Sequence, residues 1–242
     1  MAGSAPPTST AQRVTSSALR LFASKGFQAT GIREIADGAG MSSSALYYYM
    51  GTKEHLLLGI MRHALTAWYA STRQVVDESK GPAEKLCNFV RAHVICSGLY
   101  TLESAVVDTE TRSLTGDNRV EIVHLRDRYE ALMYDVLHAG AAAGVFTISD
   151  VRLLRLGLLE MCNGVSRWFS PAGRAPIEAV ADSFADVSLA AARARRASKA
   201  LRLADLELRP SAHLVSVVRR DFEAESAATI IERMASLPRD VA

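Results

Sequence analysis

Three short apolar patterns with helical spacing follow one another near the start of the chain, and glycines separate them. The first spans residues 12–25 and the second residues 31–39, and in both the apolar side chains recur at intervals of three and four. Gly26 and Gly40 follow these patterns, and glycine adopts the left-handed conformation past a helix end at little cost. A third short helix is predicted over residues 43–50. The pattern therefore indicates three short helices, the last two joined by a tight turn.

The rest of the chain has the same helical character, and the alternation of period two that is typical of strands is nearly absent. Further helices are predicted over residues 53–78, 82–97, 99–113, 118–143, 150–169 and 177–197. We expect an all-α protein with a flexible arm (residues 1–10), a helix-turn-helix domain (11–53), a helical body (54–197) and a C-terminal extension (198–242). The extension has helical composition but is interrupted by prolines, so it is expected either to dock as extra helices or to remain partly mobile.

Composition narrows the function classes. No apolar run approaches the roughly 18 residues of a membrane span, and the first ten residues lack the apolar core of a signal peptide, so a cytoplasmic protein without membrane contact is expected. The three cysteines are widely spaced, which favours buried reduced thiols over a zinc site, and no metal or cofactor is predicted. Residues 1–53 carry five Lys or Arg against two acidic residues, the sign expected of a nucleic-acid contact.

Two short helices joined through Gly40, Met41 and Ser42 form a helix-turn-helix. The first helix braces the pair. The second is short and capped, and a major groove of DNA admits a helix of this kind. The sequence thus predicts binding to double-stranded DNA.

The run TGIREIADGAGMSSSALYYYMGTKEHLL, residues 30–57, resembles the DNA-binding segment of the TetR family of bacterial transcriptional regulators. The match extends over about 45 residues from Gln12 and includes the IREIADGAG brace, the ALYYYM recognition helix and the TKEHLL start of the fourth helix. The resemblance implies an all-helical homodimer with a three-helix head and a ligand-binding body. It also implies a regulator that a small molecule releases from its operator.

Three residues of the head are expected to contact the DNA backbone. Lys53 lies in the first turn of a helix, where the helix dipole disfavours a cation unless an anion lies nearby, so a phosphate contact is predicted. Thr30 is expected to cap the second helix and to offer its hydroxyl to a phosphate. Arg33 can reach a phosphate or a guanine edge, and the alternative for it is a surface ion pair with Asp37.

The recognition helix is expected to begin at its N-cap, Ser42, and to present small side chains to the bases. Ser43, Ser44 and Ala45 would face the base edges. Tyr47 and Tyr48 would point outward and bond phosphate oxygens. The position of Tyr48 is often a histidine in the family. Because these side chains are small, the operator sequence cannot be derived from them.

The body offers candidates for a ligand pocket, although aromatic side chains at helical spacing are more often core. The candidates lie on apolar faces of the predicted helices: Trp68, Phe89, His93, Tyr100, Met133 and Trp168. The run from Gly164 to Gly173 resembles a TetR subgroup that controls fatty-acid and steroid catabolism, some members of which respond to coenzyme A thioesters. An acyl-coenzyme A effector is therefore expected, with its nucleotide end near Arg167 and Trp168.

Several alternatives remain open. An enzyme is disfavoured because the chain has no G-x-S-x-G, P-loop, H-E-x-x-H or Gly-rich dinucleotide loop. A helical adaptor that has lost DNA binding is disfavoured by the intact head. The effector is either an acyl-coenzyme A or an apolar compound of the multidrug type, and activation is the alternative to repression. The resemblance also implies that the last two body helices, Leu153–Phe169 and Ile177–Ala192, pair with those of a second copy as the dimer interface.

Overall fold

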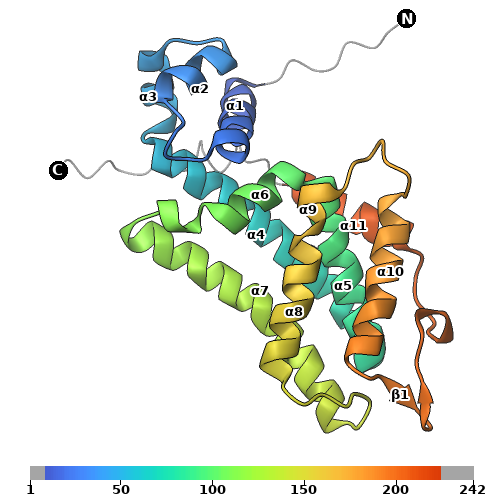
Figure 1. Ribbon diagram of the computed structural model, residues 1–242. Helices are drawn as coiled ribbons and strands as arrows, with labels where there is room; N and C mark the ends of the chain where they lie inside the picture. The colour runs from blue at the N-terminus through green and yellow to red at the C-terminus, as the bar shows by residue number, and fades with distance from the viewer. Residues whose placement is uncertain (1–8, 225–242) are drawn as a thin grey trace, which may run out of the picture.

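The structure is a computed structural model that describes residues 9–224, with only the backbone described in residues 48–50. Helices dominate the described part of the chain, which confirms the all-α expectation (Figure 1). The head consists of α1 (Thr10–Lys25), α2 (Ile32–Ala39) and α3 (Ser43–Met50). The body and the extension contain α4 (Lys53–Asp77), α5 (Pro82–Leu99), α6 (Thr101–Thr109), α7 (Gly116–Ala142), α8 (Val151–Asn163), α9 (Val165–Trp168), α10 (Ile177–Ala191) and α11 (Ser211–Ala224).

The buried side chains of the head are continuous with the hydrophobic core of the body. Phe27 folds back on Phe22 across the turn at Gly26, with 5.4 Å between the ring centroids. Gly26 and Gly40 both have positive φ angles, of 83° and 68°, which suits glycine. Leu46 of α3 is 1% exposed and belongs to the buried core, and α3 packs against α2 and α4. These contacts leave one side of α2 and α3 facing solvent.

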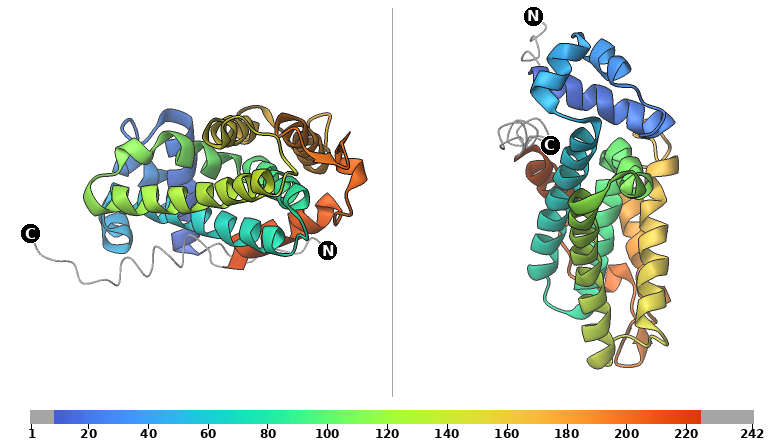
Figure 2. Two further views of the ribbon diagram at one scale, coloured as in Figure 1. Left: turned by 90° about the horizontal axis from the view of Figure 1, so that it is seen from below. Right: turned by 90° about the vertical axis from the view of Figure 1, so that its left-hand side faces the viewer.

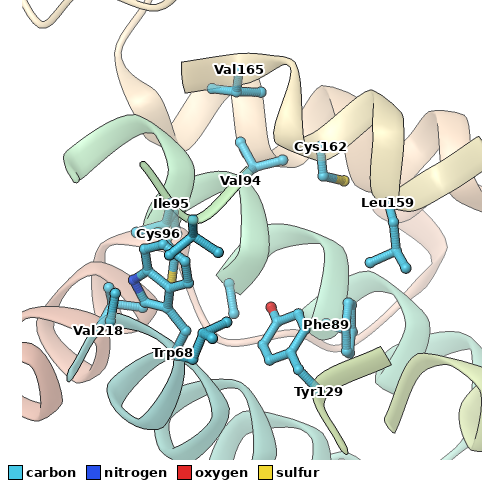
Figure 3. Close-up of a cluster of buried hydrophobic side chains, with 14 of the residues drawn as sticks. Trp68, Phe89, Val94, Ile95, Cys96, Tyr129, Leu159, Cys162, Val165 and Val218 are labelled. Carbon is cyan, nitrogen blue, oxygen red and sulfur yellow. The ribbon is translucent and has the colours of Figure 1, made fainter. Parts of the chain in front are cut away.

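The body is a bundle built around α5, which packs against α4, α7, α8 and α10 (Figures 1 and 2). Phe89, Val94 and Ile95 of α5 are fully buried in a cluster that also contains Trp68 (Figure 3). The head lies at one end of this bundle, over α4 and α6 (Figure 1). Helix α4 belongs to both parts, because its first turn contacts the head and its length crosses the body.

Three predicted helices were too long. The helix expected over residues 99–113 ends at Thr109 and continues as a 3-10 turn, Thr111–Ser113. The helix expected over 150–169 is divided at Gly164 into α8 and α9. The helix expected over 177–197 ends at Ala191, because the chain reverses with a φ of 49° at Arg193. Helical composition persists past these ends, so the pattern alone did not mark them.

A short antiparallel hairpin follows α10, with β1 (Arg195–Arg196) paired to β2 (Lys199–Ala200). A 3-10 turn, Leu203–Asp205, leads from it toward α11. Basic side chains gather in and around this hairpin, and all of them are exposed to solvent: Arg193, Arg195, Arg196, Lys199 and Arg202.

The first half of the C-terminal extension docks on the body as an additional helix. Helix α11 packs against α4 and α5 and buries Leu214, Val217 and Val218. Phe222 stacks on Tyr100, which lies between α5 and α6, at 3.6 Å between ring centroids and meets the edge of His63 of α4 at 4.4 Å. Residues 225–242, the remainder of the predicted extension, lie outside the described residues.

Arg91 holds the start of α11 from inside the body. Its side chain is 4% exposed and donates to Asp182 Oδ1 at 2.8 Å, to Ser211 Oγ at 2.9 Å and to the Arg209 carbonyl at 2.9 Å. Asn88 Oδ1 accepts a fourth bond at 3.0 Å. A buried guanidinium needs such partners, because a buried charge left unpaired is costly.

No helix in the described part of the chain combines the length and the apolar character needed to cross a bilayer. Within the same residues, no three His, Cys, Asp or Glu side chains come together in a way that would hold a metal ion.

Candidate DNA-binding head and ligand cavity

The turn between α2 and α3 has the geometry of a helix-turn-helix. Gly40 takes the left-handed conformation, and the N–H of Met41 donates to the Ala36 carbonyl at 3.0 Å. Ser42 caps α3 as predicted, since its hydroxyl accepts from the Ala45 N–H at 3.2 Å. Helix α3 is thereby fixed relative to α2.

The outer face of α3 carries the residues expected to meet DNA. Ser44 is exposed and Tyr47 is 53% exposed, and the two are three positions apart on one face of the helix. Ser43 and Ala45 are half-buried. The side chain of Tyr48 lies outside the described residues, so its predicted phosphate contact stays a prediction.

Thr30 does not cap α2, which corrects the sequence prediction. The N-cap is Gly31, whose N–H donates to Glu34 Oε2 at 2.8 Å. Thr30 is 2% exposed, and its hydroxyl donates to the Gly26 carbonyl at 2.8 Å across the turn that ends α1. Arg33 is exposed on α2. Of these two predicted phosphate contacts, only Arg33 therefore presents its side chain to solvent.

Lys53 lies at the start of α4, as predicted, but its ammonium group is engaged within the protein. Nζ donates to the carbonyl oxygens of Phe27 and Thr30, both at 2.8 Å, and lies 4.2 Å from the centroid of the Phe27 ring. Burial lowers the pKa of Lys53, and the nearby Glu110 carboxylate acts in the opposite direction. An ammonium group has three N–H donors, so one remains for a phosphate.

A cavity in the body opens to solvent between α4, α5, α6, α7 and α8, with about 660 Å³ of empty space that includes its open mouth. Its walls include apolar side chains from α4, α6 and α8, among them Leu65, Val107 and Leu159. Helix α6 contributes Ser104, Val107 and Asp108, which share one face by their spacing of three and four.

A chain of hydrogen bonds between uncharged side chains runs along one part of the cavity wall. His93 Nε2 lies 2.8 Å from Asn163 Oδ1, and its Nδ1 lies 3.1 Å from the Tyr129 hydroxyl, which in turn lies 3.3 Å from Thr72 Oγ1. Burial lowers the pKa of His93 to about 4. In the neutral ring Nε2–H donates to Asn163 and Nδ1 accepts from Tyr129, which satisfies both nitrogens.

Charged groups gather at the same cavity. Burial raises the pKa of Asp108 to about 6; Arg126 and Arg167 oppose this shift, and Glu160 adds to it. Arg126 donates to Thr111 Oγ1 at 3.1 Å, just past the end of α6. Glu130 also lines the cavity and pairs with Arg155 at 3.1 Å.

Of the predicted ligand residues, Trp68 and His93 line the cavity. Phe89 and Met133 are fully buried, and Phe89 packs against the outer side of Tyr129 at 5.3 Å between ring centroids. Tyr100 faces α11 instead, where it stacks on Phe222.

Arg167 and Trp168 lie on α9, and both are exposed. The Trp168 side chain is 57% exposed and rests near Phe184, with 6.3 Å between ring centroids. Neither residue is part of the cavity wall. The charges of α6, α7 and α8 at the cavity were not among the predicted ligand residues; the spacing of Ser104 and Asp108 on one helix face was the available signal.

Two protein-family models match this chain. A family model described as bacterial regulatory proteins, tetR family, matches residues 14–60, and one described as a tetracyclin repressor-like C-terminal domain matches residues 79–192. The transcriptional repressor KstR2 of Mycobacterium tuberculosis is 28% identical over 174 residues, which are 71% of this chain and 87% of KstR2.

Two solved structures share the fold. The regulator PfmR from Thermus thermophilus superposes with a TM-score of 0.67 at 33% identity, covering 74% of this chain and 97% of PfmR. AibR, solved in complex with isovaleryl coenzyme A and operator DNA, shares the fold with a TM-score of 0.67 at 23% identity, over 74% of this chain and 97% of AibR. Since the two family models cover the head and most of the body, this chain belongs to the TetR family of bacterial transcriptional regulators.

Proposed function

We propose that the protein is a repressor that an acyl-coenzyme A thioester releases from its operator DNA. As a member of its family the chain is a DNA-binding transcriptional regulator and not an enzyme. The observation that carries the proposal is the position of the cavity, because two of its walls are α4 and α6, which both pack against α1 of the head. A ligand in this cavity therefore touches an element that also touches the DNA-binding part.

The cavity suits the acyl part of such a ligand. Apolar walls accept a short or branched chain, and the side-chain amide of Asn163, which lines the cavity, carries N–H donors for the thioester carbonyl. The coenzyme A part is too polar and too large for the cavity, so it extends outside. There the exposed Arg167 can bind phosphate and the exposed Trp168 can stack on the adenine ring. The complex of AibR with isovaleryl coenzyme A is a precedent for this ligand class within the fold.

The acidic cavity wall favours a second candidate ligand. Three carboxylates, those of Asp108, Glu130 and Glu160, line the cavity together with the guanidinium group of Arg126. An apolar cation would be attracted by this excess of negative charge. The alternative effector is thus a cationic compound of the multidrug type.

Release of operator DNA decides between the two candidates. Fluorescence anisotropy of labelled operator would be followed while acetyl-, isovaleryl- and octanoyl-coenzyme A, the free acids, free coenzyme A and apolar cations are added. We expect a thioester to release the DNA at micromolar concentration and its free acid to be at least tenfold weaker. Release by cations alone would replace the thioester with the second candidate.

A variant pair tests the placement of the thioester. Arg167→Ala is expected to raise the thioester concentration for half-release about tenfold while leaving operator affinity unchanged, since Arg167 lies outside the head. Arg152→Ala removes another exposed arginine, on α8, and is the matched control. Equal effects of the two substitutions would show that Arg167 has no specific role.

A further inference from the structure

The backbone of Phe27 is held from two sides, by the body and by the start of α4. Its N–H donates to Glu110 Oε1 at 3.2 Å, and its carbonyl accepts from Lys53 Nζ at 2.8 Å. Phe27 lies in the turn between α1 and α2, so both bonds act on the head. We call these three residues, Phe27, Lys53 and Glu110, the Phe27 clasp.

Glu110 would move together with α6, because the two are adjacent in the chain. It follows the last residue of α6 directly and comes two residues after Asp108, which lines the cavity. The hydroxyl of Ser113 donates to Glu110 Oε2 at 2.7 Å, which orients the carboxylate. Gly26 permits the close approach, because a Cβ at that position would lie 3.3 Å from Glu110 Oε1.

The start of α4 is fixed at the same junction. Lys53 holds the head, whereas the next residue, Glu54, holds the connection between α6 and α7: it accepts from the Thr115 N–H at 2.8 Å and from Asn118 Nδ2 at 3.1 Å. A displacement of α6 therefore reaches the head by two routes, directly through Glu110 and through the first turn of α4.

We propose that Glu110 is the positioning residue that couples ligand occupancy of the cavity to the orientation of the head. A ligand that shifts α6 shifts the carboxylate, and the Phe27 turn either follows it or loses its bond. The inference rests on the proposed function for the identity of the ligand, whereas the clasp consists of hydrogen bonds within this chain. Coupling arises because the ligand then binds the two head orientations with different affinity.

Hydrogen exchange of the unliganded protein tests the clasp directly. Peptides that contain the amides of residues 26–30 would be compared in the wild type, Glu110→Ala, Glu110→Gln and Asp127→Ala, the last being an exposed α7 acid away from the head. We expect at least fivefold faster exchange at the Phe27 amide in Glu110→Ala. Wild-type rates are expected in Asp127→Ala, and nearly wild-type rates in Glu110→Gln, whose amide oxygen still accepts a bond. Equal exchange in all four proteins would overturn the clasp.

The coupling test uses the ratio of operator Kd with and without saturating isovaleryl-coenzyme A. Glu110→Ala is expected to lower this ratio about tenfold while calorimetry shows unchanged thioester binding, and Glu110→Gln is expected to restore most of it. An unchanged ratio in Glu110→Ala would overturn the coupling role. If calorimetry shows no thioester binding to the wild type, the thioester proposal fails. The ratio is then measured with the apolar cation that releases the operator, so the two failures remain distinct.

Discussion

Lys53 illustrates how one residue can serve both the fold and the DNA contact. The helix dipole disfavours a cation in the first turn of α4, yet two carbonyl oxygens of the α1–α2 turn compensate for it. With two of its donors used internally, the ammonium group is held in one place. A phosphate that meets the third donor would find a preorganised partner.

Lys53→Ala is expected to weaken binding to all DNA sequences alike and to lower the salt slope of binding by about one, the value for one lost phosphate contact. It should also lower the melting temperature, because the carbonyl groups of Phe27 and Thr30 lose their donor. Salt-dependent anisotropy titrations and thermal unfolding measure the two effects, with the exposed Lys80→Ala as control. A lower melting temperature with an unchanged salt slope would assign Lys53 a purely structural role.

Two cavity residues, His93 and Asp108, have shifted pKa values, and they make the stability of the protein depend on pH in opposite directions. His93 has a folded pKa of about 4, so between pH 4 and its ordinary value near 6.5 the unfolded chain binds more protons, and stability falls as the pH falls. The full effect amounts to about 3 kcal/mol. The pKa of Asp108 is raised to about 6, so its contribution has the opposite sign: stability falls as the pH rises from its ordinary value near 4 toward 6.

Urea unfolding at several pH values separates these parts. In Asp108→Asn the opposing contribution is gone, so we expect a steeper loss of stability between pH 6.5 and 4 than in the wild type. His93→Gln should remove most of that loss. A wild-type slope in both variants would show that neither group titrates as its burial suggests.

Local sequence rules predicted individual residues where the decisive partner is close in sequence. The cap of α3 could be predicted because the Ser42 hydroxyl and the Ala45 N–H that it accepts from are only three residues apart. The Thr30 prediction failed because Gly31 and Glu34 together provide the cap. The partners of Lys53 lie 23 and 26 residues away, so no local rule identified them. The same applies to His93 and Asn163, which are 70 residues apart.

At the scale of elements, α11 is the part of the fold that the sequence left undecided. Pro210 directly precedes α11, and the composition of this segment predicted a helix. The surface on which α11 docks is formed by α4 and α5, which are far away in the sequence. The contacts that fix it join residues far apart in the chain, such as Arg91 and Ser211, which are 120 positions apart. Helix ends were equally hard to predict, since Gly164 and Arg193 interrupt segments of continuous helical composition.

Phe222→Ala tests how firmly α11 is docked. The substitution removes a partly buried ring that contacts both Tyr100 and His63, and we expect a loss of about 2 kcal/mol in the free energy of unfolding. Arg219→Ala, an exposed change on the same helix, should cost less than about 0.5 kcal/mol. Chemical denaturation followed by circular dichroism provides both values. Equal stability of the two variants would mean that the Phe222 ring contributes no net docking energy.

The whole molecule is predicted to work as a homodimer in which α8 and α10 form the interface. Leu153 of α8 is 67% exposed and Val187 of α10 is 51% exposed, so these two neighbouring helices both present apolar side chains to solvent, which is the surface that a partner subunit would cover. Two heads about 34 Å apart would then enter successive major grooves of a palindromic operator. The sequence indicated this interface only through the apolar character of these helices.

Leu153→Glu is expected to convert the dimer to a monomer and to abolish operator binding, because a charge would be buried between two apolar helices. Val120→Glu is the matched control, since Val120 on α7 is also 67% exposed. Light scattering at micromolar concentration measures the mass of both variants. A monomeric wild type, with and without operator, would contradict the homodimer.

The anchoring of the extension by Arg91 has a consequence for biosynthesis. Arg209 and Ser211 are synthesised about 120 residues after Arg91. The guanidinium group of Arg91 therefore lacks two of its partners until the start of α11 has been synthesised and has docked on the body. A message truncated before codon 209 would yield a chain that has the head, α8 and α10 but an incompletely satisfied buried charge. We expect such chains to be cleared by proteolysis rather than to accumulate.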